Sequence, residues 1–222
     1  MRLLIKLASR SRPDKLLSVT RKYIEFAHDK TKLQFILSLD KDDTTVTETL
    51  KQELLSVHPS IRIYMGTSTS KIHALNRDIP DPSVFDILLL ASDDMIPEVS
   101  GYDNIIRQNM TIRYPDTDGV LFFNDGYNGR RLNTLCILGS KYYRRFGYIY
   151  YPGYKSFYCD NEFMRVANKL KRQTYFNTII IRHCHPGTTN ATSDSLYARN
   201  RVYAKHDKAL FDKRNPLSFL NL

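Results

Sequence analysis

Residues 85–95 (FDILLLASDDM) decide the fold, because an apolar run ends there in two adjacent aspartates. Residues 87–90 have the length and continuity of a strand buried on both faces, as in the middle of an α/β sheet. Asp93 and Asp94 follow at its C-terminal end, where open α/β sheets bind their ligands. Two neighbouring carboxylates repel each other unless a positive charge lies beside them, and their oxygens suit Mg²⁺ or Mn²⁺. A divalent cation that bridges to phosphate is one occupant, and a solvated turn capped by Asp93 is the alternative.

The preceding segments alternate between strand and helix patterns. Short apolar runs predict strands at residues 3–7, 33–39 and 61–64. Helical spacing predicts helices after Pro13, after Thr45 and Glu48 (a capping-box spacing), within residues 66–79 and at residues 101–110. This alternation predicts a parallel sheet with helices on its faces.

The second half of the chain is mixed. Residues 119–124 and 132–138 predict strands, and the turn dipeptides Asp125-Gly126 and Asn128-Gly129 favour an antiparallel hairpin between them. A helix follows residue 159, residues 174–182 predict one strand that leads to His183 and His185, and the tail after residue 190 predicts one more helix. With 222 residues and no linker, we expect a single domain.

The net charge of +10 indicates anionic partners. Nucleic acid, anionic lipid and a nucleotide diphosphate all qualify, but the basic residues form no dense tract, so nucleic acid is not expected as a partner. Three widely spaced cysteines favour a reducing compartment. No apolar run approaches the ~20 residues of a membrane span, and residues 1–11 are too short and too charged for a signal peptide. We expect a cytoplasmic protein, for which a peripheral membrane contact stays open.

The order of these landmarks resembles that of a glycosyltransferase of the GT-A fold, close to the inverting family-2 type. The matching segments span residues 3 to 186: the basic first loop, SLDKDD (38–43), KIHALN (71–76), LLLASDDMIP (88–97), LGSKYYRRFGYIYYPGY (138–154), FYCDNEF (157–163) and HCHP (183–186). Their order and spacing carry the resemblance. It implies one α/β domain with a mixed central sheet flanked by helices, residues 1–110 as its nucleotide-binding half and residues 111–222 as its acceptor and catalytic half.

The resemblance also implies a donor site. Its nucleotide-sugar contacts would be Ala8, Ser9, Arg10, Asp40, Lys71, Asn76 and Asp93. Asp40 can accept an N–H from a pyrimidine, although a simple turn acid fits equally well, and Lys71 can equally be a solvated surface lysine.

The family's metal motif is reduced here, because Ala91 replaces its leading acid. Asp94 would bind the metal, and His185, or failing it His183, resembles the late histidine that closes such sites. An imidazole suits Mn²⁺ better than Mg²⁺, so Mn²⁺ is the expected cofactor, with Mg²⁺ as the alternative. A histidine that merely ends a strand is the alternative.

Residues 159–162 (CDNE) lie where the family has a Glu-Asp pair, with Cys159 in place of the first acid. The resemblance makes Asp160 the catalytic base, and Glu162 its substitute if the helix starts elsewhere. Asp160 also suits a helix N-cap, and a helix N-terminus would lower its pKa and keep it ionised. Five tyrosines nearby fit either a stacking surface for sugar rings or a packed cluster: Tyr148, Tyr150, Tyr151, Tyr154 and Tyr158.

The implied reaction transfers a sugar from a nucleotide diphosphate donor, a UDP-sugar in our prediction, to a hydroxyl with inversion. The acceptor would be a glycan, a protein-linked glycan or a lipid. A nucleotidyltransferase is the alternative enzyme, but residues 9–13 (SRSRP) lack the glycine-rich phosphate loop expected of it. A basic nucleic-acid or polysaccharide-binding module is the non-enzymatic alternative, and such a module does not need a buried strand ending in paired acids.

Overall fold

The computed structural model describes residues 1–184 and 200–214. Its strands are β1 (Leu3–Ala8), β2 (Leu33–Asp40), β3 (Ile61–Gly66), β4 (Ile87–Ala91), β5 (Met95–Pro97), β6 (Val120–Phe123), β7 (Ile137–Gly139), β8 (Gln173–Phe176) and β9 (Ile181–His183). Its helices are α1 (Pro13–Glu25), η1 (Lys30–Lys32), α2 (Glu48–Val57), α3 (Lys71–Asn76), α4 (Tyr102–Arg113), η2 (Gly129–Arg131), α5 (Ser140–Arg144), α6 (Cys159–Lys169) and α8 (Ala204–Arg214).

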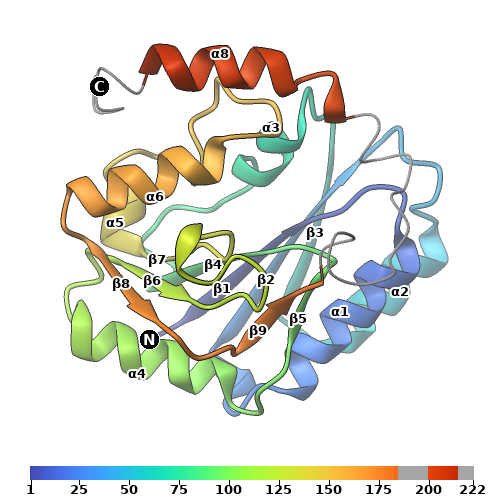
Figure 1. Cartoon of the computed structure of the whole chain (residues 1–222). Helices are drawn as coiled ribbons and strands as arrows, with labels where there is room; N and C mark the ends of the chain where they lie inside the picture. The colour runs from blue at the N-terminus through green and yellow to red at the C-terminus, as the bar shows by residue number, and fades with distance from the viewer. Residues whose placement is uncertain (185–199, 215–222) are drawn as a thin grey trace.

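Seven strands form the central sheet, in the order β3-β2-β1-β4-β7-β6-β8 (Figure 1). Strands β1 to β4 pair in parallel, and β8 runs parallel to β6. Strand β7 runs antiparallel to both of its neighbours, β4 and β6. The predicted mixed sheet, with the strand of residues 87–90 at its centre, is therefore confirmed.

Helices cover both faces of this sheet because side chains alternate between the faces along each strand. Leu3, Ile5 and Leu7 of β1 pack in the core that includes α1, α2 and α4, whereas Leu4 packs on the opposite side with α3, α5, α6 and α8. Every residue of β4 is buried. The central strand thus has the burial on both faces that its unbroken apolar run predicts.

Strands β1, β2 and β4 end at the same edge of the sheet. Ala8 pairs with Ser38, and Leu7 pairs with Ala91. The loops that follow these strands therefore meet at one edge. Strand β7 runs the opposite way, so the segment that leads into it reaches this edge as well.

The predicted capping box of α2 is wrong by two residues. Thr47 is the N-cap, and its side chain accepts the N–H of Leu50 at 3.2 Å. Thr45 Oγ1 instead donates to Asp43 Oδ1 at 2.8 Å, in the turn that precedes the helix. Because Asp43 engages the hydroxyl of Thr45, Thr45 does not cap the helix, which starts after Thr47 instead.

The predicted strand of residues 174–182 is two strands in two sheets. Strand β8 pairs with β6, whereas β9 pairs antiparallel with the short strand β5 in a separate sheet. A continuous β-branched run does not reveal where one strand ends and the next begins to pair with a different strand. Strand β5, with three residues, is too short to be recognised from its sequence pattern. The register places His183 opposite Met95, directly after the paired aspartates.

The predicted antiparallel pair of residues 119–124 and 132–138 is confirmed as β6 and β7, although its second strand is shorter. His185 and part of the predicted tail helix lie outside the described residues. Within residues 1–184 and 200–214, no helix is long and apolar enough to cross a membrane.

Candidate active site

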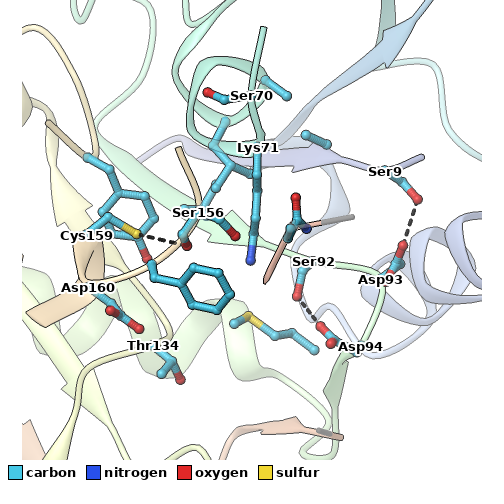
Figure 2. A pocket seen from close by; sticks show the side chains of 18 of the residues that line it. Ser9, Ser70, Lys71, Ser92, Asp93, Asp94, Thr134, Ser156, Cys159 and Asp160 are labelled. Atoms are coloured by element: carbon cyan, nitrogen blue, oxygen red, sulfur yellow. Dashed lines mark hydrogen bonds between the residues drawn. The ribbon is translucent and has the colours of Figure 1, made fainter. Parts of the chain in front are cut away.

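A cavity of about 530 Å³ opens at the carboxyl edge of the sheet. Its lining comes from the ends of β1, β2 and β4, from the start of α3, from the loops before β7 and α6, and from β9 and α8. Figure 2 shows part of this lining. The predicted site residues that line it are Ala8, Ser9, Arg10, Asp40, Lys71, Asp93, Asp94, Asp160 and His183.

Asp93 ties the first loop to the end of β4. Ser9 Oγ donates to Asp93 Oδ2 at 2.7 Å, and Arg12 Nη1 donates to Asp93 Oδ1 at 2.8 Å. Both carboxylate oxygens are therefore engaged by residues 9–12. Arg12 was not singled out from the sequence, although it stands in the basic loop that the resemblance assigned to the donor.

Asp94 turns away from Asp93 (Figure 2) and accepts a hydrogen bond from Ser92 Oγ. His183 Nε2 lies 3.7 Å from Asp94 Oδ2. Burial alone would raise the pKa of Asp94, but the interaction with His183 and the bond from Ser92 outweigh it, so the pKa lies well below its usual value. Asp94 therefore stays ionised.

Asp125 is a third carboxylate of this region, although its sequence context predicts only a turn residue. Its Oδ2 lies 3.7 Å from His183 Nδ1, on the other side of the ring from Asp94. Burial would lower the pKa of His183, but Asp125 and Asp94 together raise it to about 9. Residues 120–125 repeat the pattern of an apolar strand that ends in an acid, and this was the signal that could have identified Asp125.

The donors present fit a divalent cation in part. A carboxylate oxygen and an imidazole nitrogen 3.7 Å apart, as in Asp94 and His183, can share one ion, because ligands about 2.1 Å from an ion lie roughly 3–4 Å from each other. The described residues contain no group of three or more His, Cys, Asp or Glu side chains around a common point. Phosphate oxygens and water would have to complete such a site.

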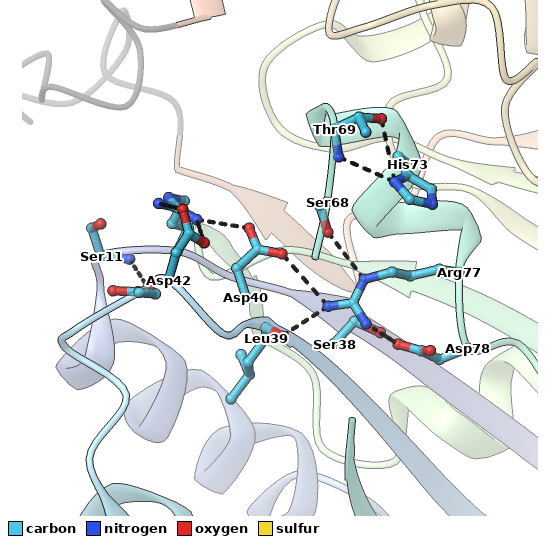
Figure 3. A network of polar contacts seen from close by, with 12 residues as sticks. Ser11, Ser38, Leu39, Asp40, Asp42, Ser68, Thr69, His73, Arg77 and Asp78 are labelled. Carbon is cyan, nitrogen blue, oxygen red and sulfur yellow. Dashed lines mark hydrogen bonds and ion pairs between the residues drawn. The ribbon is translucent and has the colours of Figure 1, made fainter. Parts of the chain in front are cut away.

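Asp40 lies at the end of β2 in a network of arginines (Figure 3). Arg10 Nη1 donates to Asp40 Oδ2 at 3.0 Å, and Arg77 Nη2 lies 3.6 Å from Asp40 Oδ1. Oδ1 is buried, and no residue of the described chain donates a hydrogen bond to it. Asp40 itself lines the cavity, but its Oδ1 faces Arg77.

Arg77 links the elements at this corner of the cavity, and no sequence motif marks it. Its guanidinium donates to Leu39 O at 2.8 Å, to Ser68 Oγ at 3.0 Å and to Asp78 Oδ2 at 2.6 Å. A Cβ at Gly66 would lie 2.5 Å from Arg77 Nη1, so glycine leaves the room that the guanidinium needs. Arg77 therefore joins the ends of β2 and β3 to the end of α3.

Lys71 and Asn76 stand at opposite ends of α3. Lys71 reaches into the cavity between Asp160 and Asp94 (Figure 2). Its positive charge helps to lower the pKa of Asp94 and opposes the rise in the pKa of Asp160. Asn76 does not line the cavity. Its Oδ1 accepts the N–H groups of Ile149 and Tyr150 at 3.0 and 3.1 Å, and its Nδ2 donates to Tyr150 O at 2.6 Å. The structure thus places Asn76 as a support for the loop before α6.

Asp160 is the second residue of α6 and faces the cavity from the side opposite Asp94 (Figure 2). It is not the N-cap, because that position belongs to Tyr158. Burial raises the pKa of Asp160, although the N–H of Asn161 and the charge of Lys71 oppose this shift. The expectation that the helix N-terminus would lower the pKa of Asp160 was therefore wrong, since desolvation is the larger effect.

Glu162 does not line the cavity. Tyr154 Oη donates to its Oε2 at 2.7 Å, and Arg214 donates to each of its oxygens at 2.8 Å. Tyr154 itself is fully buried and packs edge-on against Tyr151. Tyr151 and Tyr154 therefore belong to a packed cluster, whereas Tyr150 and Tyr158 contribute to the cavity lining.

Comparisons with known proteins find no matching family model and no matching curated protein. Solved structures do match. A mannosyltransferase from Pyrobaculum calidifontis in complex with GDP-Man and Mn²⁺ superposes with a TM-score of 0.65 at 13% identity, over 82% of this chain and 56% of that one. The fragment 1–349 of TarS from S. aureus, in complex with UDP-GlcNAc, gives a TM-score of 0.61 at 12% identity, over 90% of this chain and 64% of the fragment.

Glucosyl-3-phosphoglycerate synthase from Mycobacterium tuberculosis, in complex with Mg²⁺ and UDP, gives a TM-score of 0.57 at 11% identity, over 90% of this chain and 75% of that one. This chain has the GT-A fold. It spans little more than half of the length of the mannosyltransferase, 56%. At these identities the likeness establishes the fold, so the chemistry must be argued from the cavity.

Proposed function

We propose that the protein is a metal-dependent glycosyltransferase that moves a sugar from a UDP-sugar to an acceptor hydroxyl with inversion. The observation that carries this proposal is the placement of two carboxylates, Asp94 and Asp160, at opposite sides of one cavity, with Lys71 between them (Figure 2). The cavity lies where open α/β sheets bind ligands. The three GT-A neighbours, with GDP-Man, UDP-GlcNAc or UDP bound, support a nucleotide-sugar donor.

The nucleoside would lie against the first loop and Asp40. Asp40 lines the cavity, and a carboxylate there can accept the ring N–H of a uracil. Guanine also carries a ring N–H donor, and the bound nucleotides of the neighbours include both bases. Comparing UDP with GDP therefore tests the choice of base directly.

The diphosphate would lie near Asp94 and Lys71. Asp94 and His183 would hold a Mn²⁺ ion, which when bound supplies positive charge that offsets the charge growing on the departing diphosphate. Lys71 adds an ammonium group that can donate hydrogen bonds to the same phosphate oxygens. Asp93 would keep the first loop in place through Ser9 and Arg12.

Asp160 would accept the proton of the attacking hydroxyl. Its raised pKa makes it a stronger base than an ordinary aspartate, provided that the pH leaves it ionised. Inversion by a single displacement requires the acceptor to approach from the side opposite the leaving diphosphate. The positions of Asp160 and Asp94 on opposite sides of the cavity (Figure 2) support such an approach.

Calorimetry and a transfer assay test the proposal. UDP should bind in the presence of Mn²⁺ and more weakly in EDTA, with GDP as the comparison nucleotide. Release of UDP from a panel of UDP-sugars, with glycans and lipid-linked sugars as acceptors, then tests transfer, and NMR of the product gives the anomeric configuration. Absence of any Mn²⁺-dependent nucleotide binding would contradict the proposal, and a retained anomeric configuration would contradict inversion.

A further inference from the structure

Helix α8 lies across the ends of α3 and α6 (Figure 1), and the start of this helical region borders the cavity. Tyr203 and Ala204 belong to the cavity lining. Asp207, one turn further along α8, is completely buried. No step of the proposed reaction uses this carboxylate.

The carboxylate of Asp207 accepts three consecutive backbone N–H groups from a loop about 50 residues earlier in the chain. Oδ1 accepts the N–H of Lys155 at 3.0 Å, and Oδ2 accepts those of Ser156 and Phe157 at 2.8 Å each. His206 Nδ1 lies 2.9 Å from Oδ1. Successive N–H groups that converge in this way form an anion-binding nest, and here the anion is a side chain of α8.

The loop held by Asp207 forms one wall of the cavity and leads directly into α6. Ser156, Phe157 and Tyr158 line the cavity, and Asp160 follows two residues later. Tyr158 has a φ of 62°, a left-handed conformation that a non-glycine residue keeps only when its surroundings impose it. On its other side, the loop accepts the N–H of Ile72 at Lys155 O, at 3.3 Å.

We propose that Asp207 is a positioning residue for the acceptor side of the cavity. By fixing residues 155–157, it sets the turn at Tyr158 and hence the direction in which α6 presents Asp160. The hydrogen bonds of Asp207 go to this loop and none of them to the first loop, Asp40 or Asp94, while the loop meets the donor-side helix α3 at the Ile72 N–H, next to Lys71. The effect on transfer rests on the proposed function, whereas the effect on the loop can be measured without it.

Arg214 offers a matched control, because it attaches the other end of α8. Its guanidinium donates to both oxygens of Glu162 at 2.8 Å and lies 3.4 Å from the ring centroid of Tyr151. It does not line the cavity. Arg214→Met should loosen α8 without releasing the N–H groups of residues 155–157.

Cys159 reports on the loop. It is buried, directly precedes Asp160, and its Sγ lies 3.8 Å from Ser156 O. Cys136 is also buried but lies in the core of the sheet, so it reports on global unfolding. Alkylation by iodoacetamide, followed by mass spectrometry of the peptides, gives both rates in one experiment on the full chain.

In Asp207→Asn, alkylation of Cys159 should rise about tenfold or more, because the amide has one acceptor oxygen in place of two and no charge, while Cys136 stays protected. In Arg214→Met both cysteines should stay protected. A protected Cys159 in Asp207→Asn would overturn the proposal, as would equal exposure of Cys159 in both variants. If Asp207→Asn exposes Cys136 as well, Phe157→Pro decides instead. It removes one of the three donors and leaves α8 unchanged, so Cys159 alone should become reactive, and protection there would overturn the proposal.

The activity arm separates this inference from the proposed function. Asp207→Asn should bind UDP with Mn²⁺ within about twofold of the wild-type affinity, but its kcat for transfer should fall by roughly 10–100-fold, the cost of a misplaced catalytic group. Arg214→Met should keep both values. An equal loss of UDP affinity and kcat in Asp207→Asn would refute the acceptor-side assignment. Failure of the wild-type protein to transfer any sugar would refute the proposed function, and the alkylation rates would still decide the role of Asp207 in the loop.

Discussion

At the scale of single residues, two adjacent aspartates have different surroundings and therefore different roles. Asp93 is occupied by Ser9 and Arg12, whereas Asp94 faces His183 and the cavity. Both lie in the turn between β4 and β5, and their side chains point in different directions there (Figure 2). A sequence motif of two acids thus contains one residue that organises a loop and one that lies beside a histidine at the cavity.

Asp94→Asn should weaken UDP binding in the presence of Mn²⁺ by at least about tenfold, because the amide replaces the carboxylate proposed as the metal ligand. In EDTA the variant and the wild type should bind UDP equally weakly. Isothermal titration calorimetry measures both. Asp116→Asn is the control for a general loss of charge, because Asp116 pairs with Lys141 at the surface and does not line the cavity. Unchanged Mn²⁺-dependent binding in Asp94→Asn would exclude the metal role.

Asp160→Asn should lower kcat by about 10²–10⁴-fold and leave UDP affinity unchanged, because the amide cannot accept the proton. The stability of the Asp160→Asn variant should increase even though its activity falls. Burial raises the pKa of Asp160 in the folded state, so the stability that this group contributes is present below the unfolded pKa and is lost as the pH rises through the folded pKa.

The Asn variant should therefore melt higher than the wild type at pH 8, and this difference should disappear near pH 4. Melting curves at the two pH values and a transfer assay provide the test. A variant that retains transfer would rule out Asp160 as the base.

At the scale of elements, individual strands could be recognised from the sequence, but a change in the strand with which a segment pairs could not. The strand of residues 87–90 was recognisable because burial on both faces leaves an unbroken apolar run. The division of residues 174–182 between β8 and β9 was not, because both strands draw on the same β-branched run. That division brings His183 beside Asp94, so this part of the site could not be predicted from local pattern.

The N-cap of α2 gives a test confined to one element. Thr47→Ala should destabilise the protein by about 1 kcal/mol, because the N–H of Leu50 loses its acceptor, and Thr47→Ser should restore most of that loss. UDP affinity should not change in either variant, since α2 does not line the cavity. Urea denaturation measures the free energy of unfolding, and an equal loss in the Ser and Ala variants would contradict the cap.

At the scale of the whole molecule, the topology explains which half of the site could be anticipated. Parallel strands β1, β2 and β4 end at one edge, so residues 8–10, Asp40 and the paired aspartates had to meet there. The opposite wall depends on α8 and on the loop that Asp207 holds, which are brought together by packing over long sequence distances. Neither Asp207 nor Arg77 belongs to a local pattern, and both are visible only in the fold.

Charged groups throughout the molecule should limit its stability at both ends of the pH range. Asp118 has a pKa below its usual value, mainly because Arg145 donates to it, and Asp125 has a lowered pKa because His183 and other donors outweigh burial. Lowered carboxyl pKa values contribute stability that is present above about pH 4 and is lost as the pH falls through the folded values. With a net charge already at +10, protonation also increases repulsion, so added salt should reduce the loss in acid.

His183 affects stability at alkaline pH, because its raised pKa makes the protein less stable as the pH increases. A histidine whose pKa rises from 6.5 to about 9 on folding contributes stability that is fully present below pH 6.5 and is lost as the pH rises through 9. In EDTA, the melting temperature should therefore fall between about pH 6.5 and 9, by an amount that corresponds to a loss on the order of 1–3 kcal/mol. His183→Gln should melt lower at pH 6 and show a flatter curve over this range, because it has no charge to lose between Asp94 and Asp125. A wild-type melting temperature that stays constant from pH 6.5 to 9 in EDTA would show that His183 is not held as a cation by these two carboxylates.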